Sequence, residues 1–186
     1  NIAVLGSFNC RGVFIFDISD PDNPNLASWY NPGANLQFLE AIVIGNRGYF
    51  GTGNTGGVHI VDLTIPTNPQ LLGIVNASNG GGHPTIHEMM VFDQGNARYL
   101  LENSNSTSVR SLRIIDVTNP AAAVLKWEFN HSDNGWVHAM HIRGNRLYLS
   151  GFSSSTRIDI IDISNLASQA PALLGSVAVG LGSNHS

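Results

Sequence analysis

The sequence has few charged residues. They make up 12% of its 186 residues, about half the share of roughly 25% found in globular domains. Lys126 is the only lysine, and the formal net charge is −4. Nucleic acids and anionic membranes are bound through basic patches. This composition therefore argues against either as a partner.

Long apolar runs are also absent. Apolar residues make up 42% of the chain, but no stretch approaches the roughly 18 consecutive apolar residues of a membrane span. We therefore expect a globular chain without a membrane span, long enough to bury a sizeable core as a single domain.

Cysteine is nearly absent. Cys10 stands alone, so no internal disulfide can form, and the redox compartment stays open. The sequence starts at Asn1 without an initiator Met or a signal peptide, so we expect a mature, trimmed or fragmentary chain. Four Asn-x-Ser/Thr triplets leave glycosylation undecided, because an Asn-rich chain contains several by chance. They begin at Asn76, Asn105, Asn130 and Asn184.

What the sequence does contain is a repeat. Four segments share the pattern aliphatic-x-aliphatic-aliphatic-Asp-aliphatic-Ser/Thr, with Phe16 at one aliphatic position of the first. These Asp units are Val13–Ser19, Val58–Thr64, Leu112–Thr118 and Ile158–Ser164. Their Asp residues lie 45, 54 and 46 positions apart, a period that suits a propeller blade of four short strands. The apolar runs are short and β-branched, which disfavours helical repeats of similar length.

Each Asp unit is followed by the same succession of elements. A Pro-bearing turn comes first, in which the Asp side chain can bond nearby backbone N–H groups. A short apolar strand and a Gly/Asn-rich connection follow, and the connection leads to the innermost strand of the next unit. The expected innermost strands are Glu40–Ile44, Glu88–Phe92 and Val137–Ile142.

The repeat predicts an all-β fold, a β-propeller of four-stranded blades of which this chain covers about four. Residues 1–186 then form one domain. Its expected parts are a partial blade at 1–30, blades at 34–76, 77–129 and 130–180, and the start of a next blade at 181–186. Propellers close with about 4–8 blades, and an open arc leaves exposed edges. We therefore expect a larger propeller, completed by blades from missing sequence or another chain. The alternative is a compact four-bladed ring in which 181–186 finish the first blade.

At the segments Val58–Thr64 and Leu112–Pro120, the chain resembles the LVIVD-repeat proteins, including the choice-of-anchor B group. The resemblance implies a secreted or cell-surface β-propeller, without a common catalytic activity. The fourth unit departs from the pattern, because Asn165-Leu166 replaces the expected Asn-Pro and the proline is delayed to Pro171. That departure concerns the local turn and not the fold.

Three histidines fall at one place in the repeat. His87 and His138 align where an innermost strand starts, and His185 approaches the same position one blade later, whereas Leu39 occupies it one blade earlier. In a propeller these positions surround one mouth of the central channel. By contrast, His59 aligns with Phe14, Arg113 and Asp159, and this variable position predicts a surface residue.

Two interpretations of these histidines around the channel mouth stay open. Imidazole is the commonest metal ligand, so His87, His138 and His185 could hold a transition metal such as Zn or Cu. His83 and Glu88 could supply further ligands, or one of these groups could act as an acid or base. Alternatively, the position favours a polar side chain that bonds a neighbouring blade or channel water.

The sequence therefore favours a non-catalytic, extracytoplasmic propeller that serves as a binding or scaffold module for a protein or glycan partner. It has no Gly-x-Ser-x-Gly motif, and Cys10 has no flanking His to activate it, so no catalytic residue is predicted. One alternative is a metal-binding protein or metalloenzyme at the channel mouth. Another is a structural subunit of a surface assembly.

Overall fold

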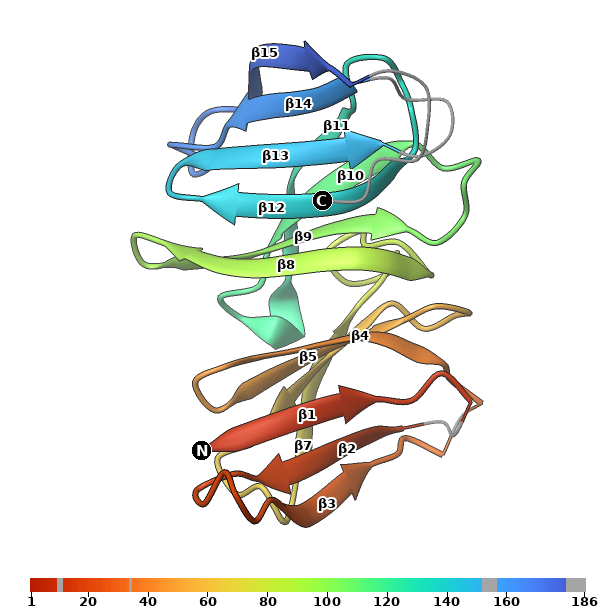
Figure 1. Ribbon diagram of the computed structural model, residues 1–186, viewed down its shortest axis with the longest axis vertical. Helices are drawn as coiled ribbons and strands as arrows, with labels where there is room; N and C mark the ends of the chain where they lie inside the picture. The colour runs from red at the N-terminus through yellow and green to blue at the C-terminus, as the bar shows by residue number, and fades with distance from the viewer. Residues whose placement is uncertain (10–11, 34, 152–156, 180–186) are drawn as a thin grey trace.

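The computed structural model describes residues 1–9, 12–33, 35–151 and 157–179. They form four antiparallel sheets stacked along the long axis of the molecule (Figure 1). Blade 1 comprises β1 (Ile2–Gly6), β2 (Val13–Asp17) and β3 (Asn25–Tyr30). Blade 2 comprises β4 (Phe38–Ile44), β5 (Arg47–Thr52), β6 (Val58–Asp62) and β7 (Gln70–Val75). Blade 3 comprises β8 (Ile86–Gln94), β9 (Ala97–Ser104), β10 (Ser111–Asp116) and β11 (Val124–Asn130). Blade 4 comprises β12 (Val137–Arg143), β13 (Arg146–Gly151), β14 (Arg157–Asp162) and β15 (Ala172–Ala178).

The all-β propeller prediction is confirmed. Strands follow chain order within each sheet, and β4, β8 and β12 are the first strands of blades 2, 3 and 4. β8 lies against both β4 and β12, as neighbouring innermost strands do around a propeller channel. In the described part of the chain, a 3-10 turn at Pro120–Ala122 is the only helical element. No helix among these residues is long and apolar enough to cross a membrane.

The repeated aspartates close the turns as their spacing predicts. In all four units the Asp Oδ1 accepts a hydrogen bond from the backbone N–H of the Ser or Thr two residues later, at 2.8–2.9 Å. These acceptors are Asp17, Asp62, Asp116 and Asp162. Each side chain thus replaces a backbone partner at the end of its strand, which fixes where the following turn begins.

The core lies between the blades. Three clusters of buried apolar side chains fill the interfaces between blades 1 and 2, 2 and 3, and 3 and 4. Alternate residues of one strand serve two interfaces, because successive side chains point to opposite faces. On β6, for example, Val58 and Ile60 pack toward blade 3, whereas Val61 packs toward blade 1.

The prediction that His59 lies on the surface is wrong. Its side chain is buried, with only 3% of the residue exposed, and its Nδ1 lies 2.7 Å from the Tyr30 hydroxyl of blade 1. The same position in blade 3 is Arg113, whose guanidinium donates to the Gly81 carbonyl at 2.8 Å. Residues that precede the blade in the chain therefore cover this position of the strand. The side chain that contacts them differs from blade to blade.

Asp159 occupies this position in blade 4. It is buried and accepts hydrogen bonds from the Ser132 N–H and hydroxyl and from the Ser176 hydroxyl at 2.6–2.7 Å. The buried His131 ring lies between two carboxylates, 2.7 Å from Asp133 and 3.5 Å from Asp159. This polar cluster joins the connection from blade 3 to the outer strands of blade 4.

Replacing Asp159 by alanine is expected to lower the free energy of unfolding by about 2–4 kcal/mol, since buried donors lose their acceptor. Urea denaturation monitored by circular dichroism measures the change. Asp22→Ala is the control, because Asp22 is exposed in a turn and its replacement should cost no more than about 0.5 kcal/mol. Equal losses in the two variants would contradict this role for Asp159.

Candidate functional site

A β-bulge begins each innermost strand and places the side chains at the channel mouth. The register of the ladders to β5 and β13 skips Leu39 and His138, and on β8 the ladder is interrupted between Ile86 and Met89. Bulges leave a residue outside the ladder and redirect its side chain. Leu39, His87 and His138 therefore leave the regular alternation at the same point of three blades.

The structure brings His87 and His138 together. Their ring centroids lie 4.8 Å apart, although the residues belong to different blades. Trp136 stands edge-on to both rings, at 4.6 Å from His87 and 5.7 Å from His138. Its indole N–H donates to the Ser104 carbonyl of blade 3 at 2.9 Å, which fixes the indole between the blades. Trp136 lies only two residues before His138 in the sequence.

The surroundings of His87 favour a neutral imidazole. Burial lowers its pKa, and the nearby His138 ring lowers it further because two close cations repel. The Nδ1 of His87 is buried and has no hydrogen-bond partner in the part of the chain that the structure describes. A neutral imidazole with such a nitrogen can bind a proton donor or a metal ion.

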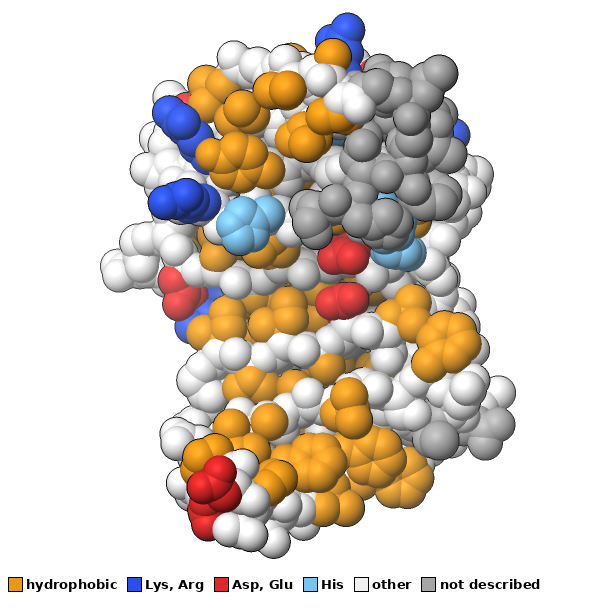
Figure 2. Space-filling view, in the orientation of Figure 1, with side chains coloured by type: hydrophobic (Ala, Val, Ile, Leu, Met, Phe, Trp, Pro, Cys, Tyr) orange, Lys and Arg blue, Asp and Glu red, His pale blue; other side chains and the backbone are white. Residues whose placement is uncertain are grey.

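Two carboxyl groups lie near the channel beside the histidines. Glu40 and Glu88 each directly follow the bulge residue of their blade. Burial raises the pKa of Glu40 to about 7, with a further contribution from the charge of Glu88, and burial raises the pKa of Glu88 as well. Acidic side chains lie next to each other near the middle of the face in Figure 2. Glu40 was not predicted as a site residue, although its alignment with Glu88 in the repeat was the signal.

His83 is engaged in a different set of contacts. It is buried, its backbone N–H donates to Glu102, and its Nε2 lies 3.2 Å from the Ser111 carbonyl at the start of β10. Burial is the main cause that lowers its pKa to about 4. Glu102 is fully buried, and its pKa is raised to about 8. This arrangement ties the connection before β8 to the outer part of blade 3.

Only some of the metal ligands expected from the sequence lie among the residues that the structure describes. His185 lies outside the described residues, as do Cys10 and the segment 181–186. Within residues 1–9, 12–33, 35–151 and 157–179, no three His, Cys, Asp or Glu side chains form a group that could hold a metal ion. The histidine pair is thus the portion of the predicted site that the described chain assembles, and metal binding stays a prediction.

The two end blades present apolar faces to solvent. On blade 1, Leu5 of β1 is 59% exposed, whereas its counterparts Phe50 and Leu149 are fully buried against a neighbouring blade. On blade 4, Val177 is 53% exposed, whereas its counterpart Val75 is fully buried. Hydrophobic side chains gather at both ends of the molecule in Figure 2. The exposed positions are therefore those at which inner blades meet.

Replacing Glu40 by Gln tests the electrostatics of the channel mouth. Native Glu40 keeps its proton up to about pH 7, whereas the unfolded chain releases it near 4.5, so this group lowers stability as the pH rises through that window. In Glu40→Gln the fall in unfolding free energy between pH 5 and 7.5 should be shallower by about 1–2 kcal/mol, a value reduced for partial exposure.

The control for this experiment is Glu128→Gln. The pKa of Glu128 is lowered by a hydrogen bond from Ser111 and by Arg113, so its carboxylate contributes stability throughout this pH range. Its replacement should lower the unfolding free energy without changing the slope. An unchanged slope in Glu40→Gln would contradict a carboxyl group that keeps its proton in the native state.

The sequence is similar to a known family of repeat proteins. The model of the LVIVD repeat matches residues 1–32, 108–131 and 140–179. A search of curated proteins found no match. Solved structures share the fold at low sequence identity, and the chain spans about half their length.

Three of these structures illustrate the likeness. A functionally unknown protein from Desulfotomaculum acetoxidans is 14% identical, with a TM-score of 0.66 over 95% of this chain and 54% of its own. The β-propeller domain of Cps50 (Swd1) from Myceliophteria thermophila is 13% identical, with a TM-score of 0.70 over 98% and 57%. The periplasmic gluconolactonase PpgL of Pseudomonas aeruginosa is 14% identical, with a TM-score of 0.67 over 97% and 52%. Because the repeat model covers more than half of the sequence and the fold agrees, the chain belongs to the LVIVD-repeat family.

Proposed function

We propose that this chain is a non-catalytic binding or scaffold module of an extracytoplasmic β-propeller, in which further blades cover its two end faces. The observation that carries the proposal is the exposure of Leu5 and Val177, whose counterparts Phe50 and Val75 in blade 2 are fully buried against a neighbouring blade. Exposed contiguous apolar surface marks an interaction site. A propeller arc with two such faces serves as one part of a closed ring.

The chemistry of the end faces supports further blades as their cover. On blade 1, Leu5 is accompanied by Phe8 and by Trp29, which stacks on Phe14 at 5.8 Å. On blade 4, Ile158 and Ile160 are only half-buried, whereas Val58 and Ile60 at the same positions of blade 2 are fully buried. A pleated apolar sheet face matches both surfaces, because this is what the inner blades place there.

A location outside the cytoplasm agrees with the family and with the composition. The LVIVD-repeat resemblance implies a secreted or surface protein, and one structural neighbour is described as periplasmic. The low charge and the many Asn, Ser, Thr and Gly residues of the loops provide hydrogen-bonding groups rather than a charged surface. Such loops suit a protein or glycan partner presented at the ends of the blades.

The end faces can be tested by self-association. Without additional blades, the chain of residues 1–186 should associate through its open faces, and Leu5→Asp or Val177→Asp should abolish the association. Light scattering at increasing concentration measures the mass.

Leu173→Asp is the matched control, because this position is exposed in all four blades, so it should leave association unchanged. A wild-type chain of 19.9 kDa that stays monomeric at every concentration would overturn the proposal and the related alternative of a structural subunit in a surface assembly.

The second candidate function is metal binding at the channel mouth, favoured by the 4.8 Å separation of the His87 and His138 rings. Here His185, Glu88 and, after rearrangement, His83 are the candidate further ligands for Zn or Cu. Elemental analysis should then find one equivalent of metal in the wild type and none in the double variant His87→Ala/His138→Ala. The control is His141→Ala, whose ring lies beside Tyr148 instead. A wild type without metal, or a double variant that retains it, would exclude this function.

A further inference from the structure

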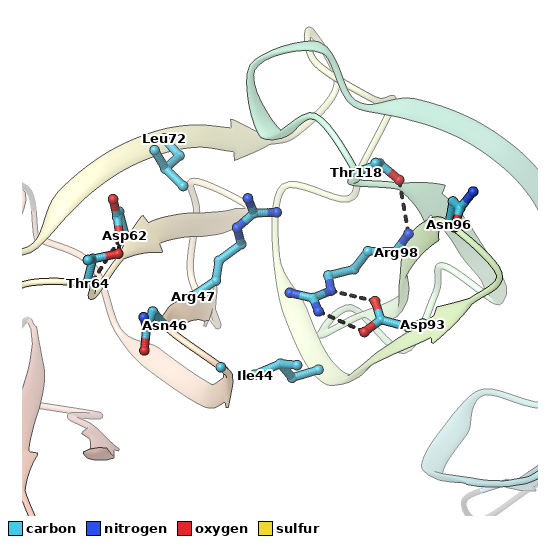
Figure 3. A pocket seen from close by; sticks show the side chains of 11 residues that line it. Ile44, Asn46, Arg47, Asp62, Thr64, Leu72, Asp93, Asn96, Arg98 and Thr118 are labelled. Atoms are coloured by element: carbon cyan, nitrogen blue, oxygen red, sulfur yellow. Dashed lines mark hydrogen bonds and ion pairs between the residues drawn. The ribbon is translucent and has the colours of Figure 1, made fainter. Parts of the chain in front are cut away.

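Grooves lie between neighbouring blades, on the side of the molecule where the turns after the Asp units lie. The groove between blades 2 and 3 has a volume of about 600 Å³. That volume lies within the range of about 300–1,000 Å³ that small-molecule sites occupy. Figure 3 shows this groove with its lining side chains, which come from the hairpins β4–β5 and β8–β9 and from the turns after β6 and β10.

Two guanidinium groups extend into this groove from opposite walls. Arg47 comes from β5 of blade 2 and Arg98 from β9 of blade 3, and both side chains point into the gap between the blades (Figure 3). Arg98 is held by Asp93 through two hydrogen bonds of 2.6 and 2.8 Å, and it also donates to the Tyr49 hydroxyl. Its charge is therefore balanced, and its position is fixed.

Arg47 makes no ion pair within the described residues. Its cross-strand neighbour Asp62 instead accepts hydrogen bonds from the N–H and hydroxyl of Thr64, at 2.8 and 2.6 Å. The Asp62 carboxylate is thus engaged in closing its own turn. A guanidinium that faces a groove and makes no ion pair can donate two parallel N–H groups to an anion.

The other two inter-blade positions lack this arrangement. The groove between blades 1 and 2, of about 480 Å³, is lined by groups such as Asn1, Asp17 and Ser19, and no arginine lines it among the residues that the structure describes. Between blades 3 and 4, the Gln94 side chain crosses from one blade to the other. Its amide donates to the Ile163 carbonyl at 2.6 Å and accepts from the Leu166 N–H at 2.8 Å. The backbone repeat thus supplies similar interfaces, and among the described residues the groove between blades 2 and 3 is the one lined by two arginines, Arg47 and Arg98, together with Asp62 and Asp93.

We propose that the groove between blades 2 and 3 binds a sugar acid, with the ligand carboxylate on Arg47. A planar carboxylate matches the two parallel N–H donors of a guanidinium. The side-chain amides of Asn46 and Asn96 line the same groove and can hydrogen bond to ligand hydroxyls. Leu72 adds an exposed apolar wall. This assignment rests on the proposed binding function and names the class of glycan.

The test measures binding of D-glucuronate to the chain of residues 1–186 by isothermal titration calorimetry. Millimolar affinity is expected for one small carboxylate at an open groove. Replacing Arg47 by Gln should weaken binding at least about tenfold, which corresponds to about 1.4 kcal/mol. The neutral methyl ester of D-glucuronate should bind the wild type at least about tenfold more weakly than the acid.

Arg146→Gln is the matched control, because Arg146 holds the position of Arg47 in blade 4 and faces Asp162 across the ladder as Arg47 faces Asp62. It should bind glucuronate like the wild type. Equal affinity in Arg47→Gln, equal loss in Arg146→Gln, or equally tight binding of inorganic sulfate or phosphate would overturn the assignment. Because the groove lies inside the arc, a monomeric chain that binds glucuronate would refute the end-face proposal and still support this site.

Discussion

The structure depends on apolar packing between the faces of neighbouring sheets. A four-stranded sheet has two faces, and here both faces of each inner blade are apolar and buried by the blades on either side. Burial of apolar surface stabilises by about 25 cal/mol per Å², so each blade relies on its neighbours for its stability. The same constraint explains why Leu5 and Val177 at the ends mark surfaces for additional blades.

The candidate sites follow from this arrangement because they form where blades meet. The His87–His138 pair and the Glu40 and Glu88 carboxyls combine residues of successive innermost strands. The groove of Arg47 combines the hairpins of blades 2 and 3. Each of these candidate sites combines residues of two blades, so a side chain gains its chemistry from the blade beside it.

The fold and part of the channel mouth could be predicted from the sequence. The four Asp units predicted the turns, and the repeat alignment placed His87 and His138 at equivalent positions. It failed at His59, because a variable position on a strand indicates exposure only when nothing crosses it, and Tyr30 of the preceding blade does. Glu40 and Arg47 were missed for a related reason, since their importance depends on side chains about 50 residues away that only the stacking of blades brings near.

The central claim is that the exposed end faces are blade interfaces, and small-angle X-ray scattering tests it most directly. Residues 1–186 in solution should form a larger closed particle, whose pair-distance distribution fits a ring with a central channel. A scattering profile that matches this single arc, unchanged with concentration, would contradict it.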